Sequence, residues 1–172
     1  KIYQGLESRI EKGKPEFANM LNNVAILAML MKREDRVEDM LKRSAEIYKL
    51  NLTENSPAYA KVISDLGNYY RYKGRYAEAE PLLQKVLQVR EEALGNVHPL
   101  YVQSLEDMAI LLWKKKELAK AYPLYHDAME KTLERIAKTG DGYPPYNIER
   151  VSSSEKGDHL RIILAVAGFS ES

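Results

Sequence analysis

Residues 57–86 read PAYAKVISDLGNYYRYKGRYAEAEPLLQKV, and this stretch decides the fold. Its first apolar run has steps of three and four, the spacing of one helix face: Ile63, Leu66, Gly67 and Tyr70. A break follows at Lys73-Gly74. The second run has the same helical spacing: Tyr76, Ala79, Leu83 and Val86. The stretch therefore predicts two α-helices joined by a short turn.

The same pattern returns along the chain at a fixed interval of 42 residues. Prolines mark the interval at Pro15, Pro57 and Pro99, and an aromatic residue stands two positions after each of them. Internal periods of about 20 to 50 residues are typical of solenoids, in which each unit buries its apolar face against its neighbours. The sequence therefore predicts an array of stacked helical hairpins.

Small residues recur where two helices of a hairpin would approach closely, at Ala25, Gly67, Ala109, Ala79 and Ala121. With the large apolar residues between them, they resemble the signature of the tetratricopeptide repeat (TPR) family. The 42-residue period and the motifs 21–25 (LNNVA), 76–83 (YAEAEPLL) and 94–99 (LGNVHP) are similar to the kinesin-light-chain type, over about residues 15–137. The chain departs from that type at Ser64-Asp65 and Glu106-Asp107, where the family often has paired asparagines. The resemblance implies an all-α fold, a right-handed superhelical solenoid of antiparallel helix pairs with about three repeats and a C-terminal capping segment.

The repeat register predicts the organisation of the chain. Three repeats are expected at 14–56, 57–98 and 99–138. Residues 1–13 have the apolar spacing of the second helix of a truncated preceding repeat, so the chain looks like an excised fragment. Glycine, proline and serine in 139–158 predict a linker, and 159–172 predicts a capping helix, although Leu160–Phe169 also fits a buried strand.

Composition restricts the function. A formal net charge of +1 gives no strong positive field, which argues against nucleic acid as a partner. The chain has no cysteine, which excludes disulfides and thiolate metal sites, and no apolar run of about 18 residues that would span a membrane. A cytoplasmic location is expected.

No catalytic motif is recognisable. The three histidines, His98, His126 and His159, lack the i, i+4 spacing of a helical metal site, and His98 is expected to be a turn residue that bonds the backbone. Phosphate-binding glycine loops and nucleophile elbows are absent from the sequence. The sequence therefore predicts no enzyme activity, no metal and no cofactor.

The resemblance implies that the first helices of the repeats line a concave groove for an extended peptide. Side chains one step away from the packed stripe are the candidate peptide-binding residues: Asn19, Asn22, Asn23, Ile26, Lys61, Ser64, Asp65, Asn68, Arg71, Tyr72, Gln103, Glu106, Ile110, Trp113 and Lys114. Among them, the asparagines can exchange hydrogen bonds with a peptide backbone, and the cations can bind acidic side chains. The aromatic residues Tyr72 and Trp113 offer contact area.

Several alternatives remain open at this stage. Asn22 and Asn23 also fit a role in bonding neighbouring helices, and Trp113 also fits a role in covering the edge of the third repeat. The expected function is a scaffold or adaptor that binds a protein or peptide. The alternative is a sensor or autoinhibitory arm of a larger signalling or effector protein, which contacts its own C-terminal segment or other domains. A weaker possibility is that Leu160–Phe169 begins an enzymatic domain.

Overall fold

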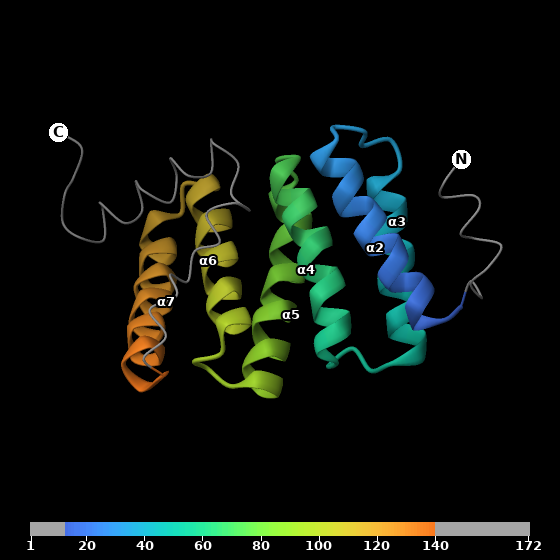
Figure 1. The fold of residues 1–172 in the computed structure, drawn as a ribbon. Helices are drawn as coiled ribbons and strands as arrows, with labels where there is room; N and C mark the ends of the chain where they lie inside the picture. Colours follow the sequence, from blue (N-terminus) through green and yellow to red (C-terminus); the bar gives the residue numbers. More distant parts are fainter. Residues whose placement is uncertain (1–12, 140–172) are drawn as a thin grey trace. The chain divides into compact units, whose positions relative to one another are not determined.

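The computed structural model describes residues 13–139, which fold into six α-helices connected by short turns (Figure 1). The helices are α2 (Pro15–Leu30), α3 (Val37–Asn51), α4 (Pro57–Tyr72), α5 (Tyr76–Leu94), α6 (Pro99–Lys114) and α7 (Leu118–Thr139). The expected helix pairs are present, and the fold is an all-α helical solenoid. The truncated preceding helix, the linker and the capping helix lie outside the described residues, so those interpretations stay predictions.

The three equally spaced prolines each begin a helix, α2, α4 and α6. Proline suits this position because its missing N–H would have no partner there and its φ is already helical. Two of these helices are also capped by a side chain. Ser56 Oγ accepts a hydrogen bond from Tyr59 N at 3.1 Å, and His98 Nδ1 accepts one from Leu100 N at 3.1 Å. The expectation that His98 bonds the backbone of a turn is confirmed.

The turn inside each hairpin repeats the same backbone geometry. Lys32, Gly74 and Lys116 have positive φ values of 55°, 74° and 64° at equivalent positions. The N–H of the next residue returns to the carbonyl five positions earlier, as in Arg75 N to Tyr70 O at 2.8 Å. This closure is the Schellman motif, for which glycine is the favoured left-handed residue. Two of the three turns therefore place lysine in a conformation that favours glycine.

The chain divides into two compact units, Lys1–Val89 and Arg90–Ser172, with the boundary inside α5. In the first unit the predicted stripe is buried, including Leu21, Ile63 and Leu83. Gly67 allows α4 and α5 to approach closely, because a Cβ at this position would lie 2.9 Å from Leu83 Cδ2. The predicted role of the small residue is thus confirmed at Gly67.

The second unit has a core of the same kind. Leu105 and Ala109 of α6 are buried, as are Tyr125 and Ala128 of α7. At the start of this unit, buried Arg90 donates through one Nη to Leu100 O at 2.9 Å and to Ser104 Oγ at 2.8 Å. These bonds fix the last turn of α5 to α6.

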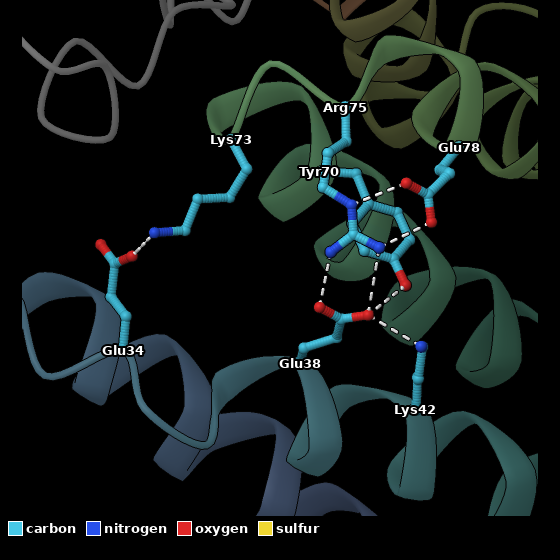
Figure 2. A network of polar contacts seen from close by, with 7 residues as sticks. All are labelled: Glu34, Glu38, Lys42, Tyr70, Lys73, Arg75 and Glu78. Carbon is cyan, nitrogen blue, oxygen red and sulfur yellow. Dashed lines mark hydrogen bonds and ion pairs between the residues drawn. The ribbon is translucent and has the colours of Figure 1, made fainter.

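A charged network joins the first two hairpins (Figure 2). Glu38 of α3 accepts from Arg75 at 2.6 Å, contacts Lys42 at 2.7 Å, and accepts from the Tyr70 hydroxyl at 3.1 Å. Arg75 also bonds Glu78, and its guanidinium lies 4.3 Å from the centre of the Tyr70 ring. The hydrogen bond from Arg75, followed by that from Lys42, lowers the pKa of Glu38 from 4.5 to about 2. Lys73 pairs with Glu34 beside this network.

Candidate protein-binding face

Side chains that α2 and α4 do not use for packing form one surface in the first unit. The two helices lie side by side (Figure 1), and Asn22 Nδ2 donates to Asp65 Oδ2 at 2.8 Å between them. Near the C-terminal end of each helix, Leu30 and Tyr72 occupy equivalent positions and are 77% and 61% exposed. We call this surface the α2–α4 face: Asn19, Asn23, Ile26, Leu30, Lys61, Asp65, Asn68, Arg71 and Tyr72.

Polar groups on the α2–α4 face already contact one another. Lys61 Nζ lies 3.4 Å from Asp65 Oδ2, and Arg71 Nε donates to Asn68 Oδ1 at 3.2 Å. An acidic ligand group would therefore have to draw each cation away from a partner within the chain. The face mixes amide, charged and aromatic groups on rigid helices, a composition suited to recognising another polypeptide.

Two candidate residues of the first unit are less accessible than expected. Asn22 is wholly buried and Ser64 is 5% exposed, although both were expected to line the groove. They occupy the same position of successive repeats, and Asn22 shows the reason, because its amide turns toward the neighbouring helix and bonds Asp65. The alternative role of Asn22, bonding a neighbouring helix, is the one that the structure displays.

The expected groove residues of α6 differ more strongly from the prediction. Glu106 and Ile110 are 8% and 3% exposed, so neither presents an open surface. Ile110 belongs to a core cluster with Ala109 and Tyr125, and Trp113 packs against that cluster. Trp113 is thus used in packing, as its alternative interpretation held. Gln103, Trp113 and Lys114 are half-buried.

Burial changes the acidity of Glu106. Desolvation of its carboxylate, with a smaller contribution from the neighbouring charge of Asp107, raises its pKa from 4.5 to about 8. No hydrogen bond or ion pair to another described residue offsets this burial. Glu106 is therefore largely protonated near neutral pH.

The sequence patterns did not reveal two features of the first unit. One is the network around Glu38, of which only the Glu38–Lys42 and Arg75–Glu78 spacings were visible in the sequence. The other is Leu27, which is 56% exposed although its equivalents Tyr69 and Leu111 are 6% and 0% exposed. The apolar register gives these three residues the same role, so their different burial could not be predicted from it.

Across residues 13–139, no three His, Cys, Asp or Glu side chains lie together in a way that could hold a metal ion. None of the described helices is both long enough and apolar enough to cross a membrane.

Stacked antiparallel hairpins with a 42-residue period and close contacts at small residues define the class of helical repeat proteins that form solenoids. The sequence profile described as "Tetratricopeptide repeat" matches residues 16–92 and 63–134. The chain belongs to the tetratricopeptide repeat family. Proteins built from this repeat are generally protein-interaction modules rather than catalysts. No curated protein matches the chain.

Solved structures of kinesin-light-chain-like repeat proteins have the same fold. Two come from Podosopora anserina and are described as kinesin light chain with nearly identical TPR-like repeats. They align with TM-scores of 0.69 and 0.63 at 17% and 19% identity, over 99% and 77% of this chain and 85% and 60% of theirs. BtubC (BKLC) from P. vanneervenii aligns with a TM-score of 0.65 at 21% identity, over 83% of this chain. The chain spans 60% and 54% of the length of the second and third of these proteins.

Proposed function

We propose that this chain is a protein-interaction scaffold whose α2–α4 face binds an extended segment of a partner protein in the cytoplasm. The observation that carries the proposal is that α2 and α4 each have one buried side and one exposed side. Leu21 and Ile63 are buried in the core, whereas Asn19 and Lys61, two positions earlier in each helix, are exposed. The outward side is thus available at equivalent points of two adjacent helices.

The chemistry of this face suits an extended polypeptide. Asn19, Asn23 and Asn68 carry carboxamides, which both donate and accept hydrogen bonds and so match the unpaired N–H and C=O groups of a strand-like ligand. Leu30 and Tyr72 add exposed apolar and aromatic area near one end. Gln103 and Lys114 of α6 are half-buried candidates for the same role in the second unit.

The test is affinity capture from cell extract with the full chain, followed by mass spectrometry. The double variant Asn68→Ala/Arg71→Ala is expected to lose partners that wild type retains, while its melting temperature stays nearly unchanged. The matched control is Glu46→Ala/Gln84→Ala, which alters two exposed residues of the second helices α3 and α5. Equal partner recovery by all three proteins would remove the α2–α4 face from consideration.

A second candidate function, a sensor or autoinhibitory arm, is favoured by the burial of α6. Every residue from Ser104 to Leu112 is buried, including positions whose equivalents on α4, Asp65 and Asn68, are half-buried. In this role the third repeat is engaged within its own protein until a signal frees it. Hydrogen exchange tests it by comparing the full chain with a chain that ends at Thr139. Faster exchange of α6 in the shorter chain supports the arm, and equal exchange contradicts it.

A further inference from the structure

One buried polar atom of the α2–α4 region has no partner. Asn22 is wholly buried, and its Oδ1 has no hydrogen-bond partner. The orientation of its amide is fixed, because Nδ2 donates to Asp65 Oδ2 at 2.8 Å and a flipped amide would set two acceptors together. An unsatisfied buried acceptor is unfavourable, and native proteins rarely retain one without a reason.

Asp65 places a negative charge beside this acceptor. Its side chain is 16% exposed, so part of the carboxylate is open to solvent. The hydrogen bonds from Asn22 and Lys61 both reach Oδ2, which leaves Oδ1 with no donor among the described residues. The carboxylate of Asp65 thus keeps one oxygen without a donor, while Asn22 holds the other oxygen in place between α2 and α4.

The contact between Lys61 and Asp65 shows that a cationic group can bind at this carboxylate. Its ammonium group lies 3.4 Å from Asp65 Oδ2, a long contact, and its side chain is 54% exposed. A pair so exposed contributes little and exchanges readily. Lys61 is therefore a loosely held cation that a better-placed cation from a ligand can replace.

We propose that Asp65, held in place by the Asn22 amide, forms a subsite for a lysine or arginine side chain of the bound partner segment. An ammonium or guanidinium group carries only donors and a positive charge, which is the complement of a carboxylate with one oxygen that lacks a donor. A glutamine would bring an acceptor of its own, and a glutamate would be repelled. This inference rests on the proposed function and specifies the ligand at one position of the α2–α4 face.

The net charge of the chain is +1, so the chain as a whole has no general attraction for cationic peptides. A preference for a basic side chain would thus come from a local site.

The test uses an array of twelve-residue peptides with one extended serine, threonine and valine host sequence. The central residue is lysine, arginine, acetyl-lysine, glutamine or glutamate, and the probe is the fluorescently labelled full chain. Wild type is expected to bind the lysine and arginine peptides about tenfold more tightly than the acetyl-lysine peptide, as one charge-assisted hydrogen bond would give. Asp65→Asn is expected to remove this preference.

The matched control is Asp39→Asn, which removes the same charge from an exposed position of α3 and should leave the preference intact. Lys61→Met keeps the side-chain stem and should strengthen binding of the lysine peptide by about twofold or more, since the competing cation is gone. Unchanged or weaker binding by Lys61→Met would overturn the subsite. Peptide binding without a preference for cations would refute the subsite alone, and binding of no peptide would refute the proposed function with it.

Discussion

Glu106→Gln is expected to raise the free energy of unfolding in mildly alkaline solution and to leave it nearly unchanged in acid. The Glu106 carboxyl has a pKa of about 8 in the folded chain and an ordinary value of 4.5 when unfolded. Because folding raises the pKa, the stability contributed by the protonated group is fully present below pH 4.5. It is lost progressively as the pH rises through 8. Glutamine resembles the protonated acid in shape and does not titrate.

The magnitude follows from the size of the shift. Each pKa unit corresponds to about 1.4 kcal/mol, so the full shift sets a ceiling of roughly 4–5 kcal/mol for the loss above pH 8. Between pH 5.5 and 8.5 we expect Glu106 to account for a fall of about 2–4 kcal/mol in the free energy of unfolding. A loss of that size is a large part of the stability of a domain.

Urea unfolding at pH 5.5, 7.0 and 8.5 measures this difference. Trp113, the single tryptophan of the chain, lies on the same helix and reports on the second unit by fluorescence. Wild type should lose stability with rising pH, whereas Glu106→Gln should not show this fall. Glu130→Gln, which changes an exposed carboxylate of α7, is the control and should behave as wild type. Parallel pH profiles for wild type and Glu106→Gln would refute the reasoning.

Four further substitutions test the packing, the turns and the charged network. Gly67→Leu should lower the free energy of unfolding by about 1–3 kcal/mol or more, because even a Cβ at this position would lie 2.9 Å from Leu83. An unshifted midpoint in circular-dichroism melting would contradict the close contact. Gly74→Ala should destabilise and Lys116→Gly should stabilise the chain, each by about 1 kcal/mol, because both residues have positive φ; changes of the same sign in urea unfolding would argue against this. Glu38→Gln should cost about 1–2 kcal/mol at pH 7, after allowance for partial solvent exposure. Since the pKa of Glu38 is lowered to about 2, its contribution is present above pH 4.5 and fades as the pH falls toward 2. Wild type and Glu38→Gln should therefore converge in acid-unfolding curves, and a constant difference down to pH 2 would disprove the assignment.

The repeat pattern of the sequence was sufficient for the fold. Packing between two helices depends on which positions are large, small or apolar, and these properties can be read directly at Leu21, Ile63, Gly67 and Leu105. The first residues of these helices could also be predicted from the sequence. Proline at Pro15, Pro57 and Pro99 favours the first turn of a helix because its ring fixes φ at a helical value. These are local or strictly periodic effects, so a single sequence carries them.

The candidate face could be only partly predicted. Helical spacing identified Asn19, Lys61 and Tyr72 as outward residues, and the structure exposes them. The same spacing treated Asn22, Glu106 and Ile110 as outward, and all three are buried. Spacing tells which side of a helix a residue occupies, but it does not tell how far the neighbouring elements reach over that side.

Sequence alone determined that the chain is an array of helical hairpins of the tetratricopeptide type, because a period of 42 residues and its apolar stripe are properties of the chain itself. Tertiary structure decided the rest. The pairing of Asn22 with Asp65, the burial of Glu106 and the clustering of charges around Glu38 each depend on residues distant along the chain being brought together. Burial and charge pairing arise from three-dimensional neighbours, and the spacing of residues along one helix does not contain them.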